Sequence, residues 1–196
     1  MRVIPVSLAV EDPLSESVVR AILGVLNRGY AVGSVYGKGG FGYLRKSAPR
    51  FNQAARGTPY VMLTDLDNAP CSSALIDRWL GASHMKHPNF VFRVAVREVE
   101  AWLLADGPNL AEFLRVSTKL MPKENVELLV DPKKTLVDIA SRSKSRDIRE
   151  RINRQAGPRL QCVSGRFCAA RVGHSPSLFT VRQFESGRPL SGGLRA

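Results

Sequence analysis

Two aspartates two residues apart, Asp65 and Asp67, are the residues whose type and spacing most directly indicate chemistry. They follow four apolar or aromatic residues, 60–63, which is typical of a strand buried on both faces of a parallel sheet. Two carboxylates this close repel each other unless a cation lies between them, and Mg²⁺ is commonly held by one or two carboxylates and several waters. The same spacing also arises when the first Asp caps a helix and the second lies in a solvated loop. The pair alone leaves both interpretations open.

Acidic residues also end two other apolar stretches. Glu11 follows residues 3–10, and Glu98 and Glu100 follow residues 89–96. The strands of an open α/β sheet deliver their functional side chains at their carboxyl ends, so we expect these acids to meet the aspartate pair there. Residues two apart on a helix point in different directions. We expect Glu100 to face the pair, because it lies near the edge of the apolar side of its helix.

These acids can meet only if strands and helices alternate so that the strands form one parallel sheet, and the sequence predicts such an α/β fold. Asp12 and Pro13 predict a helix N-terminus, with Asp as N-cap and Pro at the first helical position, and Asp131 and Pro132 predict another. Pro49 predicts that the helix before the third strand begins near it. The expected strands are residues 3–10, 30–36, 60–63 and 89–96, forming a central, mostly parallel sheet flanked by helices.

The charge balance indicates a polyanionic partner. The net charge is +12, from 29 basic and 17 acidic residues, and residues 133–171 carry eleven Lys or Arg against three acids. DNA or RNA is the leading candidate, and a set of solvated helix faces is the alternative. The glycine-rich stretch 37–42 could approach a phosphate, although it lacks the Walker A and dinucleotide orders. The candidate nucleic-acid contacts are Lys38, Arg45, Lys46, Lys133 and Lys134.

Composition argues against several other classes of protein. No apolar run approaches the roughly 20 residues of a transmembrane helix, and we expect no signal peptide and no membrane partner. Three cysteines fit no C-x-x-C pattern, so we expect free thiols and neither a disulfide framework nor a zinc site. We therefore expect a cytoplasmic protein.

The order strand–Glu, helix, strand, helix, strand–Asp-x-Asp, helix, strand–acid resembles a topoisomerase–primase (TOPRIM) domain. Over residues 3–185 the chain is also similar to a TOPRIM-like family, domain of unknown function four-two-seven-six, which is related to the nuclease domain of OLD-type (overcoming lysogenisation defect) proteins. A TOPRIM domain usually has Gly after the first acid, where this chain has Asp12. The stretches that carry the resemblance are 9–16, 63–67, 97–106, 131–133 and 175–178.

The resemblance implies a Rossmann-like TOPRIM core at residues 1–106. We expect a helical, basic extension packed on the core at 107–186 and a disordered tail at 187–196. The resemblance further implies that Glu11, Asp65 and Asp67 bind Mg²⁺ or Mn²⁺, with Glu100 and Glu98 completing a second site. The catalytic acids would be Glu11, Asp65, Asp67 and Glu100.

The function implied is a Mg²⁺-dependent nuclease, or a related phosphoryl transfer on DNA or RNA, in phage defence or DNA repair with an AAA-type ATPase. The alternative is a catalytically silent TOPRIM-like module that binds nucleic acid or regulates an ATPase complex. A small-molecule phosphotransferase is a weaker third option, because no nucleotide-binding motif is present and the charge is strongly positive.

Overall fold

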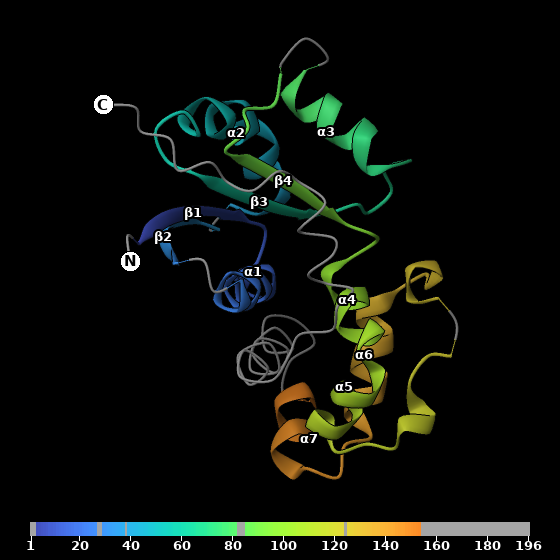
Figure 1. Cartoon of the computed structure of the whole chain (residues 1–196). Coiled ribbons are helices and arrows are strands. Elements are labelled where there is room, and N and C mark those ends of the chain that lie inside the picture. The colour runs from blue at the N-terminus through green and yellow to red at the C-terminus, as the bar shows by residue number, and fades with distance from the viewer. Residues whose placement is uncertain (1–2, 27–28, 38, 82–84, 124, 154–196) are drawn as a thin grey trace.

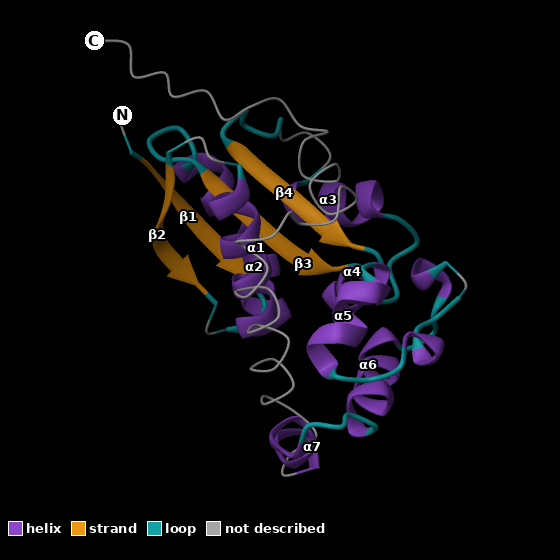
Figure 2. Cartoon of the chain, turned by 60° about the horizontal axis from the view of Figure 1, so that its bottom comes forward, coloured by secondary structure: helices purple, strands orange, loops and turns teal. Residues whose placement is uncertain are grey.

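A four-stranded, all-parallel sheet lies at the centre of the structure, a computed structural model that describes residues 3–26, 29–37, 39–81, 85–123 and 125–153. The strand order is β2-β1-β3-β4, as Figure 2 shows. The expected α/β class and the parallel sheet are confirmed, and the strand order is consistent with a Rossmann-like arrangement. The strands are β1 (Ile4–Val10), β2 (Tyr30–Tyr36), β3 (Tyr60–Asp65) and β4 (Phe90–Ala95).

Helices cover both faces of this sheet (Figure 1). Helix α1 (Pro13–Val25) lies on one face, and α2 (Gly40–Ala54) and α3 (Ser72–Leu80) lie on the other. Successive residues of a strand point to opposite faces. Val61 and Leu63 of β3 therefore join the apolar cluster around α1, whereas Tyr60 and Met62 pack with α2 and α3.

Helix α2 differs from the sequence prediction. It begins at Gly40 rather than near Pro49, and Pro49 lies inside it. Pro removes one backbone hydrogen bond from a helix interior, but Leu44 and Phe51 of the same helix are buried against the sheet. Burial of this apolar stripe stabilises a helix that local propensity alone would have started later. The glycine-rich stretch is thus partly the first turn of a helix.

Both Asp-Pro helix starts are confirmed. Asp12 is the N-cap of α1, and its Oδ1 accepts a hydrogen bond from the Ser15 N–H at 2.8 Å. Asp131 caps the later helix α6 (Pro132–Ser141), and its Oδ1 accepts from the Lys134 N–H at 2.7 Å. Each cap satisfies a backbone donor that the first helical turn leaves unpaired.

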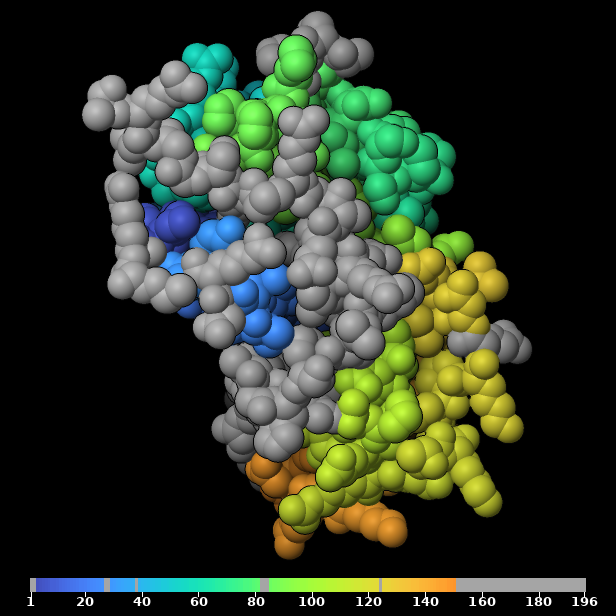
Figure 3. Space-filling view, viewed as in Figure 1, coloured from blue at the N-terminus to red at the C-terminus, as the bar shows by residue number. Residues whose placement is uncertain are grey.

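The chain after β4 forms a group of short helices on the α1 face. They are α4 (Val99–Ala105), α5 (Gly107–Leu114), the 3₁₀ turns η1 (Thr118–Leu120) and η2 (Val126–Leu128), α6, and α7 (Arg146–Asn153). Leu110 and Leu136 belong to the same apolar cluster as β1 and α1. In Figure 3 this segment, yellow-green to orange, gathers away from α2 and α3.

The expected extension 107–186 is described only to residue 153, and the expected tail 187–196 lies outside the described residues. Within the described part of the chain, no helix is both long enough and apolar enough to span a membrane.

The chain direction across the sheet reverses at β1. Helix α1 leads from β1 to β2 on one side, and α2 leads back across β1 to β3 on the other side. Loops therefore diverge between the carboxyl ends of β1 and β3, which is where open α/β sheets form their binding crevice. The register pairs Val10 with Leu63, and Asp65 with Ala95 of β4. Glu11 and Asp65 are thereby brought to one edge.

We predict that Leu63→Ala lowers the free energy of unfolding by about 2–5 kcal/mol, because Leu63 is 0% exposed and the substitution leaves a cavity. Urea unfolding measures this change. Val130→Ala is the control, since Val130 is 89% exposed and a surface change is worth within about 0.5 kcal/mol. Equal losses in the two variants would contradict the packing of β3.

Candidate functional site

Glu11 and β3 meet through a side-chain hydrogen bond. The Thr64 hydroxyl donates to Glu11 Oε2 at 3.0 Å, and Thr64 is 0% exposed. Burial raises the pKa of Glu11, while the Thr64 hydrogen bond opposes that rise and the carboxylates of Asp67 and Asp12 add to it. Thr64 was not among the predicted site residues. A hydroxyl inside an otherwise apolar strand was the signal for it.

Asp65 is the most strongly perturbed acid at this edge. It ends β3, and its Oδ1 accepts the N–H of Val99, the first residue of α4, at 3.0 Å. Burial is the main cause that raises the pKa of Asp65 to about 9, followed by the carboxylates of Glu100, Glu11 and Asp12. Asp12, expected only as a helix cap, therefore also contributes charge to the site.

Glu100 and Glu98 take different positions, as the helix geometry predicts. Glu100 lies in the first turn of α4, is 5% exposed, and has its pKa raised to about 7, mainly by burial. Glu98 is half-buried, and its Oε2 accepts the Lys133 N–H of α6 at 3.2 Å. Burial raises the pKa of Glu98 as well. The carboxylate of Glu100 raises the pKa of Asp65, whereas that of Glu98 is hydrogen-bonded to the start of α6.

Asp67 departs from Asp65 in both conformation and burial. The Leu66 N–H donates to the carbonyl oxygens of Ala95 and Arg97, both at 2.9 Å, and Asp67 then adopts a φ of 47°. Asp67 is exposed, and its carboxylate contributes to the raised pKa values of Glu11 and Glu98. The main charged neighbours of Asp65 are thus Glu100, Glu11 and Asp12, not the Asp67 that the sequence spacing placed beside it.

These side chains form an acidic cluster at the carboxyl edge of the sheet, near the point of Figure 2 where β3 and β4 run toward α4. Among the described residues, no three His, Cys, Asp or Glu side chains are placed to hold a metal ion together. Mg²⁺ is, however, usually bound through one or two carboxylates and several waters, and all donors here are hard carboxylate oxygens. The donor chemistry therefore fits Mg²⁺ or Mn²⁺. The acidic cluster consists of Glu11, Asp12, Asp65, Asp67, Glu98 and Glu100.

Two of the predicted basic residues, Lys133 and Arg45, lie near members of the acidic cluster. Lys133 and Lys134 are exposed in the first turn of α6, and the charge of Lys133 lowers the pKa values of Glu98 and Glu100. Arg45 and Lys46 are exposed on α2, and Arg45 shares a pocket with Asp67. Lys38 lies outside the described residues.

We predict that Asp65→Asn makes the protein more stable at pH 8 without divalent cations. Folding raises the pKa of the Asp65 carboxyl from 3.8 to about 9, so the folded state favours its protonated form. The free energy that this form contributes to folding is fully present below pH 3.8. That contribution is lost as the pH rises toward 9, at about 1.4 kcal/mol per pH unit. Asn cannot ionise and keeps an acceptor for the Val99 N–H, so urea unfolding at several pH values in EDTA should show a flatter curve.

Glu112→Gln is the control for this measurement, because Glu112 is an exposed acid on α5. It should keep the wild-type pH dependence. The Asp65→Asn variant should retain a smaller slope below pH 7 from Glu100, whose pKa is about 7. Parallel curves for the wild type and Asp65→Asn would show that the Asp65 carboxylate is not destabilised by its surroundings.

Comparisons with protein-family models, with curated proteins and with solved structures each gave no match for this chain. The resemblance to TOPRIM-like families therefore remains a prediction from the motifs. The function must be argued from the geometry and the charge of the acidic cluster.

Proposed function

We propose that this chain is a Mg²⁺- or Mn²⁺-dependent nuclease with a TOPRIM-like acidic centre. The observation that carries the proposal is the clustering of Glu11, Asp65 and Glu100 at the carboxyl edge of the sheet. Burial and the neighbouring carboxylates there raise the pKa of Asp65 to about 9. Clustered, desolvated carboxylates are unfavourable unless protons or a cation neutralise them. A divalent cation at the carboxyl edge would replace those protons at neutral pH.

In this proposal the acidic cluster both holds the metal and accepts a proton. Glu11, Asp65, Asp67, Glu98 and Glu100 are the residues that would hold the metal, which when bound would neutralise phosphate charge and polarise the reacting oxygens. The Thr64 hydroxyl fixes one carboxylate oxygen of Glu11, and the Val99 N–H fixes one of Asp65. A carboxylate of the acidic cluster that does not hold the metal would accept the proton of an attacking water.

Nucleic acid is the substrate that the charge distribution favours. The chain carries a net charge of +12, and Lys133 lies near Glu100 while Arg45 lines a pocket with Asp67. Cations beside an acidic centre can hold the strand on both sides of a phosphate, and binding then depends on salt. An AAA-type ATPase partner and a role in phage defence or DNA repair belong to the proposal through the OLD-type resemblance alone.

The second candidate function is a catalytically silent module that binds nucleic acid or regulates an ATPase complex. It is favoured by one observation: no three potential ligand side chains among the described residues converge on a metal position. The fold alone does not distinguish the nuclease from the silent module.

We predict that the wild type cleaves plasmid or single-stranded nucleic acid when Mg²⁺ or Mn²⁺ is present, and that Asp65→Asn/Asp67→Asn lowers the rate at least about 100-fold. Calorimetric titration with the cation should show binding to the wild type that the double variant loses. Glu112→Ala/Asp138→Ala removes the same charge from exposed positions and should change neither result. Cation binding without cleavage would favour the silent module. A folded protein that shows no cation binding and no cleavage would rule out the metal site.

We also predict that Lys133→Ala/Lys134→Ala weakens nucleic-acid binding and reduces its salt dependence. Each lost phosphate contact should lower the slope of log K against log salt by about 0.7–0.9. Fluorescence anisotropy across a salt series measures the slope. Lys119→Ala/Lys123→Ala removes two exposed lysines around η1 and should leave the slope unchanged. An unchanged slope in the first variant would place the nucleic acid elsewhere.

A further inference from the structure

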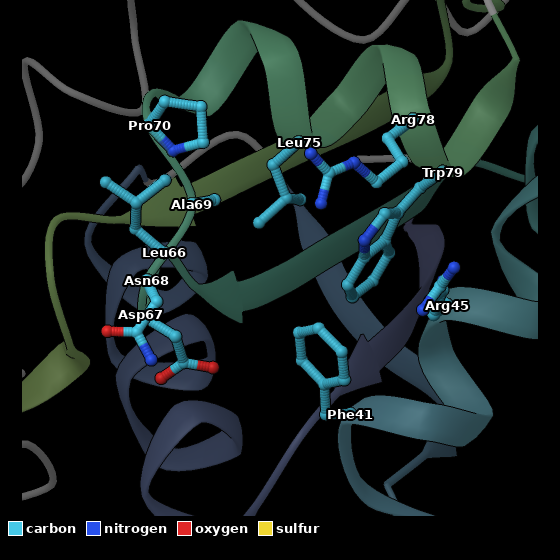
Figure 4. A pocket seen from close by; sticks show the side chains of 10 residues that line it. All are labelled: Phe41, Arg45, Leu66, Asp67, Asn68, Ala69, Pro70, Leu75, Arg78 and Trp79. Atoms are coloured by element: carbon cyan, nitrogen blue, oxygen red, sulfur yellow. The ribbon is translucent and has the colours of Figure 1, made fainter.

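A pocket of about 350 Å³ opens on the α2 and α3 side of the sheet, beside the loop that follows β3. Figure 4 shows Phe41 and Arg45 from α2, Trp79 and Arg78 from α3, and Asp67 from the loop around it. Its volume lies near the lower end of the roughly 300–1,000 Å³ of small-ligand pockets. The pocket is therefore large enough for one unit of a polymer or for one small molecule.

Aromatic rings form one wall of this pocket. The rings of Phe41 and Trp79 meet edge to face, with centroids 5.0 Å apart and planes at 85°. Trp79 is 4% exposed and belongs to the core, whereas Phe41 is partly exposed at the pocket. A partly exposed ring supported by a buried one offers a fixed apolar surface for a planar group.

Two arginines bring positive charge to the same pocket. The side chains of Arg45 and Arg78 are exposed, and neither forms an ion pair with another described residue. A guanidinium group presents several donors in a plane, which matches the oxygens of a phosphate. An aromatic surface and two arginines together match a nucleotide, which combines a planar base with an anionic phosphate.

Asp67 connects the pocket to the acidic cluster. It lines the pocket, and its negative charge also raises the pKa values of Glu11 and Glu98. A ligand in the pocket therefore lies next to the carboxyl edge where the proposed chemistry takes place. This adjacency favours a part of the substrate over an unrelated small molecule.

We propose that this pocket binds one unpaired nucleotide of the substrate strand, with its base against Phe41 and the phosphates on either side of it at Arg45 and Arg78. The inference rests on the proposed function in taking nucleic acid as the substrate. A base enters a pocket only after it has left its stack, and that step is easiest in a single strand or at an unpaired position. The pocket thus selects single-stranded or locally unpaired nucleic acid over a continuous duplex.

The test measures binding in EDTA by fluorescence anisotropy, with a labelled single-stranded thymidine oligonucleotide, an abasic oligonucleotide of equal length and the matching duplex. The wild type should bind the thymidine strand at least about fivefold more tightly than the abasic strand, because stacking contributes that much or more. Phe41→Ala should abolish this difference. Phe41→Leu should also abolish the difference, because leucine has no aromatic face. This variant keeps an apolar contact with Trp79 and so preserves the packing.

Arg78→Ala should weaken binding of both single strands equally and lower the salt slope by about 0.7. Arg56→Ala is the matched control, because Arg56 is an exposed arginine just beyond the other end of α2, and it should change neither base preference nor slope. Equal binding of the thymidine and abasic strands by the wild type would overturn the proposal. So would tighter binding of the duplex, or tight binding of free thymidine monophosphate without affinity for the strand.

No divalent cation is present in this measurement, so it is independent of cleavage. A protein that fails it can still show metal-dependent cleavage that Asp65→Asn/Asp67→Asn abolishes. Conversely, a protein that does not cleave can still show the base preference at Phe41. The two proposals can therefore fail separately.

Discussion

The burial of the Asp65 carboxyl is the constraint on which the rest of this site depends. A carboxylate taken out of water is stable only with donors or positive charge beside it. Here the chain supplies one backbone donor, the Val99 N–H, and adds the neighbouring carboxylates of Glu100 and Glu11, which work against ionisation. The Val99 hydrogen bond thus fixes the start of α4, while the neighbouring carboxylates leave the carboxyl edge short of positive charge.

Sheet topology explains why these acids meet although they are distant in the sequence. The crossing of α2 over β1 places β1 and β3 side by side, and their parallel pairing aligns Val10 with Leu63. The residues that follow these strands must then emerge at one edge. Helix α4 adds Glu100 from beyond β4. The same crossing puts α2 next to α3, and so brings Phe41 to Trp79.

Much of this could be predicted from local patterns, because local interactions determine it. Asp12-Pro13 and Asp131-Pro132 mark helix starts through caps made within one turn, and apolar runs mark the strands. Prediction failed where distant contacts decide. Pro49 lies within α2 because the helix is buried against the sheet. The positive φ of Asp67 follows hydrogen bonds from the Leu66 N–H to the carbonyl oxygens of Ala95, at the end of β4, and Arg97, just beyond it. The pocket needs Phe41 and Arg78 from separate helices, which no spacing in the sequence reveals.

Glu98 is shared between two parts of the molecule. Its carboxylate accepts the backbone N–H of Lys133 at the start of α6 and also raises the pKa of Glu100 in the acidic cluster. A carboxylate is a stronger hydrogen-bond acceptor than a neutral carboxyl, so the ionisation of Glu98 and the anchoring of α6 are thermodynamically linked. By reciprocity, whatever holds the first turn of α6 in place also favours the ionised form of Glu98. The position of α6 is thereby coupled to the charge of the carboxyl edge through the Glu98 side chain.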